Sequence, residues 1–227
     1  LNGSFDFYTR DTKNMLTKSQ TLPAVLAVTE PQANAADLRT KGFDLTLNWN
    51  DQVGDFRYGF TGILSDYLAK ITRFSNPSGL ISDYYEGADM GNIWGLTTGG
   101  LFQTDAEALA LDQSNINGRK RQAGDLWMVD INGDGKITRG AQTLSNPGDM
   151  SIIGNNTPRY SFGLRTNLAW KGFDMDIFFQ GVGKRDLVIS NLYYLTQYSN
   201  EWVGIPKVAM DYWSPENPDA FFPRPII

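Results

Sequence analysis

The sequence predicts an all-β chain: an antiparallel transmembrane β-barrel segment of about five strands from a larger barrel, with long extracellular loops that contain a short helix. Three observations lead to this class. Several segments alternate strictly between apolar and polar residues, which is the period of a strand with two different faces. Short turns and long loops alternate between those segments. No apolar run approaches the roughly 20 residues that a membrane-spanning helix needs.

The first two-faced segments lie in the N-terminal third of the chain. From Phe43 to Asn50 every odd position is apolar and every even position is polar. After a polar turn over residues 51–55, which contains Gly54, the same alternation resumes at Phe56. These segments predict a hairpin with strands near 41–50 and 56–68. Residues 1–9 alternate in the same way and predict a further strand.

A second hairpin is predicted near 159–170 and 173–184. Tyr160, Phe162 and Leu164 share one face of the first segment, and Phe173, Met175 and Ile177 share one face of the second. Only Lys171 and Gly172 separate the two segments. Glycine suits the positive φ of a two-residue hairpin turn.

Loop lengths indicate that the strands belong to a membrane barrel. Loops of about 30 residues (10–40), about 85 residues (74–159) and the stretch from about 186 alternate with the two short turns. Tight turns at one end and long loops at the other are typical of outer-membrane barrels. A soluble β-sandwich can show a similar alternation. Aromatic residues near strand ends fit either an interfacial girdle or an ordinary core; they are Trp49, Phe56, Tyr160, Trp170 and Phe173.

The 74–159 loop carries one helix signal. Thr104 and Glu107 form a capping box that opens a short helix through about Leu111. Asn115, Asn117 and Gly118 are expected to end it.

Composition excludes several classes of protein. The 227 residues hold 20 Lys and Arg against 25 Asp and Glu, a formal charge of −5, whereas a general nucleic-acid binder is basic. There is no His and no Cys, which removes His-based acid–base work, Ser-His and Cys-His nucleophiles and thiolate zinc sites. Asp44, Asp174 and Asp176 lie on polar strand faces, where a wet barrel interior would place charge. We therefore expect no catalytic residue and no enzyme activity.

Residues 130–138 match the first half of a calcium-binding loop. They offer oxygens at relative positions one, three and five, Gly at position six and a backbone carbonyl at position seven. Position twelve is Ala141, so the bidentate Glu of an EF-hand is missing. The alternative is a tight turn whose Asp and Asn side chains accept backbone N–H bonds without an ion. Ca²⁺ is the one candidate cofactor, with candidate ligands Asp130, Asn132, Asp134, Lys136 through its carbonyl, and Thr138 or water.

Aromatic residues in the long loops are candidates for contact with a ligand or partner. The candidates are Trp127, Tyr193, Tyr194 and Trp202. Aromatic faces can stack on sugars or anchor a protein partner, although packing within the loops explains these residues about as well.

Longer motifs carry a family resemblance. The segments DINGDGKIT (130–138), NPGD (146–149), IGNNTPRY (153–160) and KGFDMDIFFQG (171–181) resemble the late-barrel signature of SusC/RagA proteins, which are TonB-linked outer-membrane importers. Further matches cover almost the whole chain: FYTRDT (7–12), LPA (22–24), KGFDL (41–45) and DYWSPENPDAFFPR (211–224).

The resemblance implies a barrel of about 22 strands with an N-terminal plug, in the outer membrane of a Gram-negative bacterium. It also implies import powered through TonB, and a SusD-like lipoprotein lid that captures glycans or peptides. All 227 residues would belong to the C-terminal part of the barrel, and the plug and TonB box would be absent from this chain. The loops at 74–159 and from about 186 would contact the lid or its cargo.

In this interpretation the odd-numbered stripe of the 41–50 and 56–68 strands meets membrane lipid. Asp44, Thr46, Asn48 and Arg57 line the wet interior. Two other classes stay open: a soluble calcium-dependent carbohydrate-binding β-sandwich, which would bury its apolar stripes, and a structural surface-layer or adhesion fragment.

Overall fold

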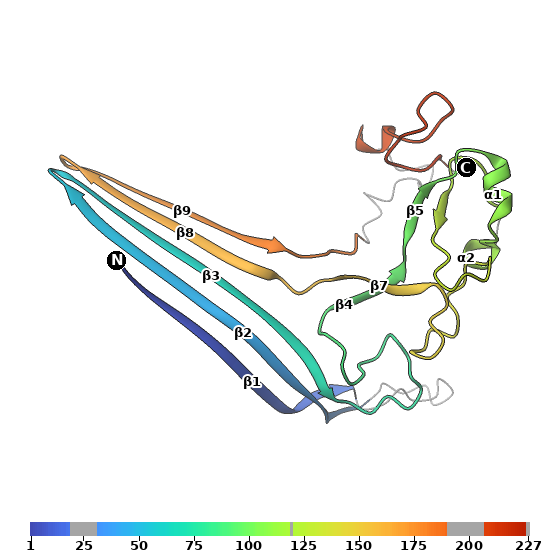
Figure 1. Ribbon diagram of the computed structural model, residues 1–227, viewed down its shortest axis with the longest axis horizontal. Coiled ribbons are helices and arrows are strands. Elements are labelled where there is room, and N and C mark those ends of the chain that lie inside the picture. The colour runs from blue at the N-terminus through green and yellow to red at the C-terminus, as the bar shows by residue number, and fades with distance from the viewer. Residues whose placement is uncertain (19–30, 119, 190–206, 226–227) are drawn as a thin grey trace. The chain divides into compact units, whose positions relative to one another are not determined.

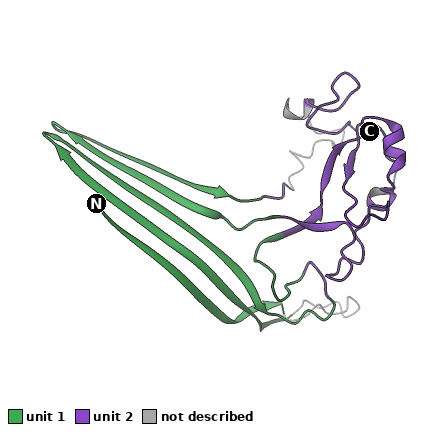
Figure 2. Ribbon diagram, in the orientation of Figure 1, with its two compact units in different colours: residues 1–78, 83–92, 154–186 green, residues 79–82, 93–153, 187–227 purple. Residues whose placement is uncertain are grey.

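The computed structural model describes residues 1–18, 31–118, 120–189 and 207–225 (Figure 1). These residues form mostly antiparallel β-sheet with very little helix, so the predicted all-β class is confirmed. The chain divides into two compact units, coloured separately in Figure 2. The first unit comprises residues 1–78, 83–92 and 154–186, and the second comprises 79–82, 93–153 and 187–227.

The first unit is built on one five-stranded sheet. Its strands lie in the order β1-β2-β3-β8-β9, and each pairs antiparallel with its neighbours. The five predicted strands are therefore confirmed. Their bounds are β1 Asn2–Lys18, β2 Gln32–Val53, β3 Phe56–Arg73, β8 Arg159–Trp170 and β9 Phe173–Lys184.

The first two strands are longer than predicted. Their pairing continues as far as Lys18 opposite Gln32, so much of the expected loop at 10–40 is strand. The prediction was wrong because polar and charged residues dominate this stretch, and the apolar–polar alternation that marks a strand is lost there. Bulges near Met15 also interrupt the regular register.

Both tight turns contain two residues. Val53 pairs with Phe56, which leaves only Gly54 and Asp55 in the first turn, so the predicted turn at 51–55 was too long. At the second turn Lys171 (φ 46°) and Gly172 (φ 86°) both have positive φ, as predicted for a two-residue hairpin loop.

Strand pairing sorts the side chains of this sheet onto two faces. Phe5, Leu45, Leu64 and Phe162 lie opposite one another in successive strands and share one face. Ser4, Thr46 and Ile63 share the other. The predicted odd-numbered apolar stripe is therefore correct for β2 and wrong for β3, where the even-numbered residues share the face of Leu45 because Leu45 pairs with Leu64. In the described residues, β1 and β9 do not pair with each other, so the sheet is open rather than closed.

The second unit holds short elements, and most of them lie within the span predicted as a long loop at 74–159. Strand β4 (Asn92–Leu96) pairs with β7 (Met150–Asn155), and β5 (Thr98–Leu101) pairs with β6 (Leu126–Met128). A 3₁₀ turn spans Lys207–Met210. No helix among the described residues is long and apolar enough to cross a membrane.

The predicted helix is confirmed at its start and at its end near Leu111, but the residues expected to stop it do not do so. Helix α1 (Asp105–Ala110) begins after Thr104, whose side chain accepts the N–H of Glu107, while the Glu107 carboxylate accepts the N–H of Gln103 at 2.8 Å. Asn115 and Asn117 belong instead to a second short helix, α2 (Ser114–Asn117), and Gly118 (φ 66°) ends that helix in the left-handed conformation.

Candidate functional site

One face of the five-stranded sheet is apolar over the part next to the tight turns. We call this surface the apolar face. Its side chains are largely exposed, including Phe7 at 70% and Phe173 at 76%. Monomeric soluble proteins rarely expose apolar patches larger than a few hundred Å². The apolar face therefore requires an apolar neighbour. Its members are Phe5, Phe7, Leu45, Leu47, Trp49, Phe56, Phe60, Leu64, Phe162, Leu164, Leu168, Trp170, Phe173, Met175 and Phe179.

Aromatic rings gather at the tight-turn end of the apolar face. Tyr58 packs edge-on against Trp49 (5.8 Å between ring centroids) and against Phe60 (6.1 Å). Trp170 and Phe173 lie opposite each other beside the second turn. Four of the five predicted girdle residues thus lie near the two tight turns. Tyr160 lies at the far end of β8, where the Arg159 guanidinium lies 5.3 Å from the centre of its ring.

The height of the apolar face can be estimated from β3. Phe56 lies at its tight-turn end, and Asp66, ten residues later, is its first charged residue on this face. At about 3.3 Å per residue and a tilt of about 40°, ten residues span about 25 Å, the height of the apolar band on outer-membrane barrels. The apolar face thus ends where a membrane would end.

The opposite face is mostly polar, with Ile63, Phe178 and Val182 as exposed apolar exceptions, and we call it the polar face. Asp44, Thr46, Asn48 and Arg57, predicted to line a wet interior, all lie on it. Asn48 accepts a hydrogen bond from the Thr61 hydroxyl at 2.8 Å. The face thus carries its own hydrogen-bonding groups.

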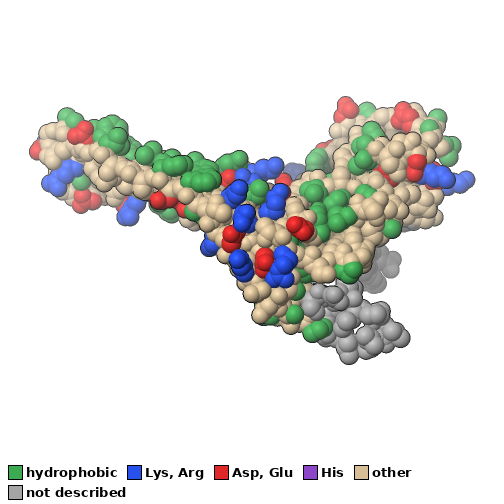
Figure 3. All heavy atoms as spheres, turned by 60° about the horizontal axis from the view of Figure 1, so that its bottom comes forward, with side chains coloured by type: hydrophobic (Ala, Val, Ile, Leu, Met, Phe, Trp, Pro, Cys, Tyr) green, Lys and Arg blue, Asp and Glu red, His purple; other side chains and the backbone are tan. Residues whose placement is uncertain are grey.

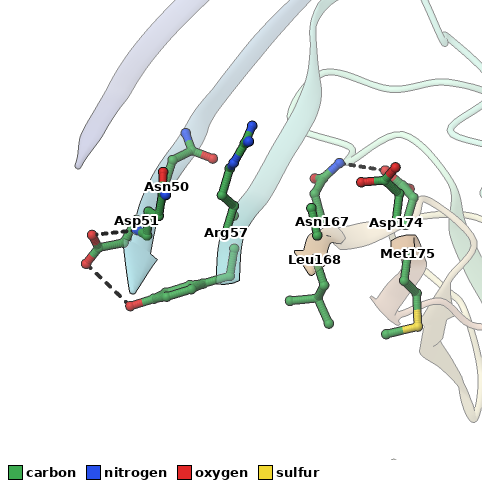
Figure 4. A pocket seen from close by; sticks show the side chains of 12 residues that line it. Asn50, Asp51, Arg57, Asn167, Leu168, Asp174 and Met175 are labelled. Carbon is green, nitrogen blue, oxygen red and sulfur yellow. Dashed lines mark hydrogen bonds between the residues drawn. The ribbon is translucent and has the colours of Figure 1, made fainter. Parts of the chain in front are cut away.

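The polar face is hollowed next to the tight turns. Figure 4 shows Asn50, Arg57, Asn167 and Asp174 pointing to one side of the sheet, and Leu168 and Met175 to the other. The depression has a volume of about 700 Å³. Asp176 accepts from Asn167 at 2.7 Å and pairs with Arg165 at 2.8 Å. Polar side chains from β2, β3, β8 and β9 thus line most of this hollow, and Asn167 and Asp176 are held by hydrogen bonds.

The end of the apolar face farther from the tight turns carries an ion pair that the sequence did not predict. The Arg159 guanidinium donates to both carboxylate oxygens of Asp66, at 2.6 and 2.5 Å, and the Tyr160 N–H donates to the same carboxylate. Asp66 is only 7% exposed. The two residues are 93 positions apart in the chain, and only the pairing of β3 with β8 brings them together.

The candidate calcium loop forms a chain of side-chain-capped turns. The Asp130 carboxylate accepts the N–H groups of Gly133 and Gly135, both at 2.7 Å. Asn132 accepts from the Asp134 N–H at 3.0 Å, and Asp134 accepts from the Lys136 N–H at 2.8 Å. The two glycine N–H groups lower the pKa of Asp130, with Gly135 contributing most. The carboxylate of Asp130 is thereby held in its ionised form.

The loop closes on a residue that the sequence analysis did not single out as a site. Asp149 is fully buried, and its carboxylate accepts the N–H groups of Ile131 at 2.9 Å, of Thr138 at 2.7 Å and of Asn132 at 3.4 Å. The signal available was its place in the NPGD motif shortly after the loop. Asp149 ties the start of the loop to its end.

The candidate aromatic residues are only partly described. The Trp127 side chain lies against Gly99, where an added Cβ would come within 2.1 Å of the ring. Its ring thus packs within the second unit, and a ligand-binding role for Trp127 stays a prediction. Tyr193, Tyr194 and Trp202 lie outside the described residues.

A long-stranded antiparallel sheet with one apolar face, one polar face and tight turns at one end has the construction of a barrel-wall segment. The chain is 24% identical over 238 residues to the TonB-dependent receptor P3 of Formosa agariphila, covering 99% of this chain and 22% of that protein. It thus spans about a fifth of this curated relative. No protein-family model matches the chain.

Solved structures show the same fold. The RagAB peptide transporter matches with a TM-score of 0.67 at 16% identity, over 98% of this chain and 24% of that chain. The RagAB peptide importer matches in its closed-closed state (TM-score 0.63, 18% identity, 98% of this chain and 24% of that chain). The importer in its open-open state gives a TM-score of 0.63 at 16% identity, over 98% of this chain and 23% of that chain. The resemblance to part of a SusC/RagA-like TonB-dependent receptor is therefore confirmed.

Proposed function

We propose that this chain forms part of the barrel wall of a SusC-like, TonB-dependent nutrient importer in the outer membrane of a Gram-negative bacterium. The observation that carries the proposal is the apolar face, about 25 Å high, opposite a hydrogen-bonded polar face. The apolar face meets lipid, and the polar face lines the interior. The similarity to a TonB-dependent receptor and to peptide transporters supports this assignment.

The finer parts of the proposal follow from the family resemblance. All 227 residues belong to the C-terminal part of a barrel of about 22 strands. Residues 74–159 and those from about 186 form the outer surface, where a SusD-like lipoprotein delivers oligosaccharide or peptide cargo. Import is driven through TonB, and no residue here makes or breaks a covalent bond. The curated relative is named a receptor and the solved relatives are named transporters, which supports a role other than catalysis.

Single cysteines would test the lipid-facing assignment, because the chain has none of its own. Leu47 and Thr46 are neighbours on opposite faces of β2. We expect a spin label at Leu47→Cys, in the intact receptor in vesicles, to collide with dissolved oxygen more than with a water-soluble nickel complex. A label at Thr46→Cys should show the reverse. Equal accessibility at both sites would contradict the proposal.

A soluble calcium-dependent carbohydrate-binding β-sandwich is the alternative, and residues 130–138 are the observation in its favour. A sandwich needs a second sheet over the apolar stripes. No described segment provides one, since the apolar face is exposed. A protein that stays soluble and monomeric without detergent would favour this alternative.

We also propose that residues 130–138 bind Ca²⁺. Asp130 already accepts two N–H bonds, but a carboxylate offers about four acceptor positions, so capacity for an ion remains. Calorimetry on the intact receptor should detect binding of Ca²⁺ that Asp134→Asn weakens. Asp219→Asn, also in the second unit, is the control. Identical titrations for all three proteins, or no heat at all, would contradict the site.

A further inference from the structure

Three basic residues lie on the same side of the sheet as the apolar face, beyond its end farther from the tight turns. We call Arg39, Lys41 and Lys70 the basic row. Lys41 lies two residues beyond Phe43 on β2 and opposite Leu68 on β3, and Arg39 lies opposite Lys70. The surface therefore changes from apolar to basic within one or two rows of residues. Figure 3 shows Lys and Arg side chains gathered with acidic ones where the hydrophobic run over the sheet ends.

The arrangement is costly for an isolated sheet. Like charges directly opposite each other on one face of a sheet are destabilising, and Arg39 faces Lys70 in this way. Each of them has its own carboxylate: Arg39 pairs with Asp11 at 2.7 Å and Lys70 with Asp89 at 3.4 Å. Lys41 is exposed and makes no ion pair with any described residue. The basic row therefore keeps one uncompensated positive charge.

The remaining cations stay open to an incoming anion. The side chains of Arg39 and Lys70 are 50% and 51% exposed, so their pairing with carboxylates leaves donors free. Arg159 on the neighbouring strand β8, by contrast, is paired with the buried carboxylate of Asp66. The surplus charge is thus concentrated at Lys41.

Position identifies the partner. Lys41 lies twelve residues from the tight turn along β2, and Arg39 and Lys70 lie fourteen residues from it. If the apolar face meets lipid, as proposed above, the basic row lies about 30–35 Å from the tight turns, just beyond the apolar band of about 25 Å and at the level of the lipid headgroups. Basic residues there attract anionic headgroups, and the aliphatic part of a lysine can lie along an apolar surface such as Phe43. The lipids whose acyl chains cover the apolar face carry those headgroups, so the same molecules can contact both the apolar face and the basic row.

We propose that Arg39, Lys41 and Lys70 form a binding site for the phosphate groups of anionic lipid headgroups in the membrane leaflet next to the long loops. Lys41 pairs directly with phosphate, and Arg39 and Lys70 add donors on either side. This inference rests on the proposed membrane function.

Two lipid probes and three variants test the site. Purified intact receptor in detergent is incubated with diphosphorylated lipid A or with its enzymatically dephosphorylated form, and bound lipid is measured by native mass spectrometry. We expect preferential binding of the phosphorylated lipid. Lys41→Gln should weaken that binding about fivefold, as for one cation near an anionic lipid surface. Lys41→Arg should keep it. Lys171→Gln, which removes the same charge at the tight-turn end, should leave it unchanged.

Equal binding of both lipids, or equal loss in Lys41→Gln and Lys171→Gln, would overturn the headgroup site. A spin label at position 47 separates this failure from failure of the membrane assignment. If the label reports lipid contact in wild type and in Lys41→Gln, but phosphate makes no difference, only the headgroup site is wrong. If the label reports water, both proposals fall together.

Discussion

Asp149 shows how one buried carboxylate can organise an exposed loop. It accepts three N–H groups from the two ends of residues 130–138. In Asp149→Asn the amide would direct N–H donors at backbone N–H donors, so we expect this loop to lose about 1–3 kcal/mol of local stability. Hydrogen exchange at Ile131 and Thr138 measures the loss. Asp219→Asn should leave both amides protected, and unchanged protection in Asp149→Asn would contradict this role.

Acid should loosen the same loop through Asp130. Its pKa is lowered in the folded state by the N–H groups of Gly135 and Gly133. A lowered folded-state pKa means that the stabilisation is complete above the unfolded value, about 3.9, and is lost as the pH falls through the lower folded value. Protection of the Gly133 and Gly135 amides should therefore disappear only below about pH 4. Asp130→Asn should remove this pH dependence, and a transition near pH 6 would implicate another group.

Within one strand, neighbouring positions should respond in opposite ways to the same charge. Leu47 lies on the apolar face and Thr46 on the polar face of β2. An arginine on the lipid face near the middle of the membrane costs about 2–4 kcal/mol, so Leu47→Arg should lower the folding stability of the intact receptor by that amount. Thr46→Arg should cost much less. Urea unfolding in vesicles measures both, and equal losses would show that β2 has no lipid-facing side.

The strands were the most predictable elements, because a pleated strand presents successive side chains to opposite faces. The alternation alone identified the strand at Phe43–Asn50. The glycine identified the turn at Lys171 and Gly172. Residues 10–18 and 32–40 were missed because both faces there carry polar side chains. A backbone ladder holds these residues in the sheet whatever their side chains, so no periodicity reveals it.

The open sheet has consequences for the chain as a separate molecule. Its apolar face is exposed, and in the described residues the outer edges of β1 and β9 are not paired with each other. Exposed strand edges beside apolar surface are templates for aggregation. The isolated 227 residues should therefore aggregate in plain buffer or require detergent. Sedimentation with and without detergent decides this, and a monodisperse monomer in buffer would count against the barrel-wall assignment.

By itself the sequence determined which segments alternate between two faces, the places of the two tight turns, the helix start at Thr104 and the family resemblance, because each of these depends on residues close together in the chain. Only the tertiary structure decided which distant residues meet. The ion pair of Asp66 with Arg159, the three bonds to Asp149 and the basic row of Arg39, Lys41 and Lys70 all depend on strand register or loop closure. A shift of one residue in register would turn a strand's side chains to the other face, and such long-range alignment leaves no local trace in the sequence.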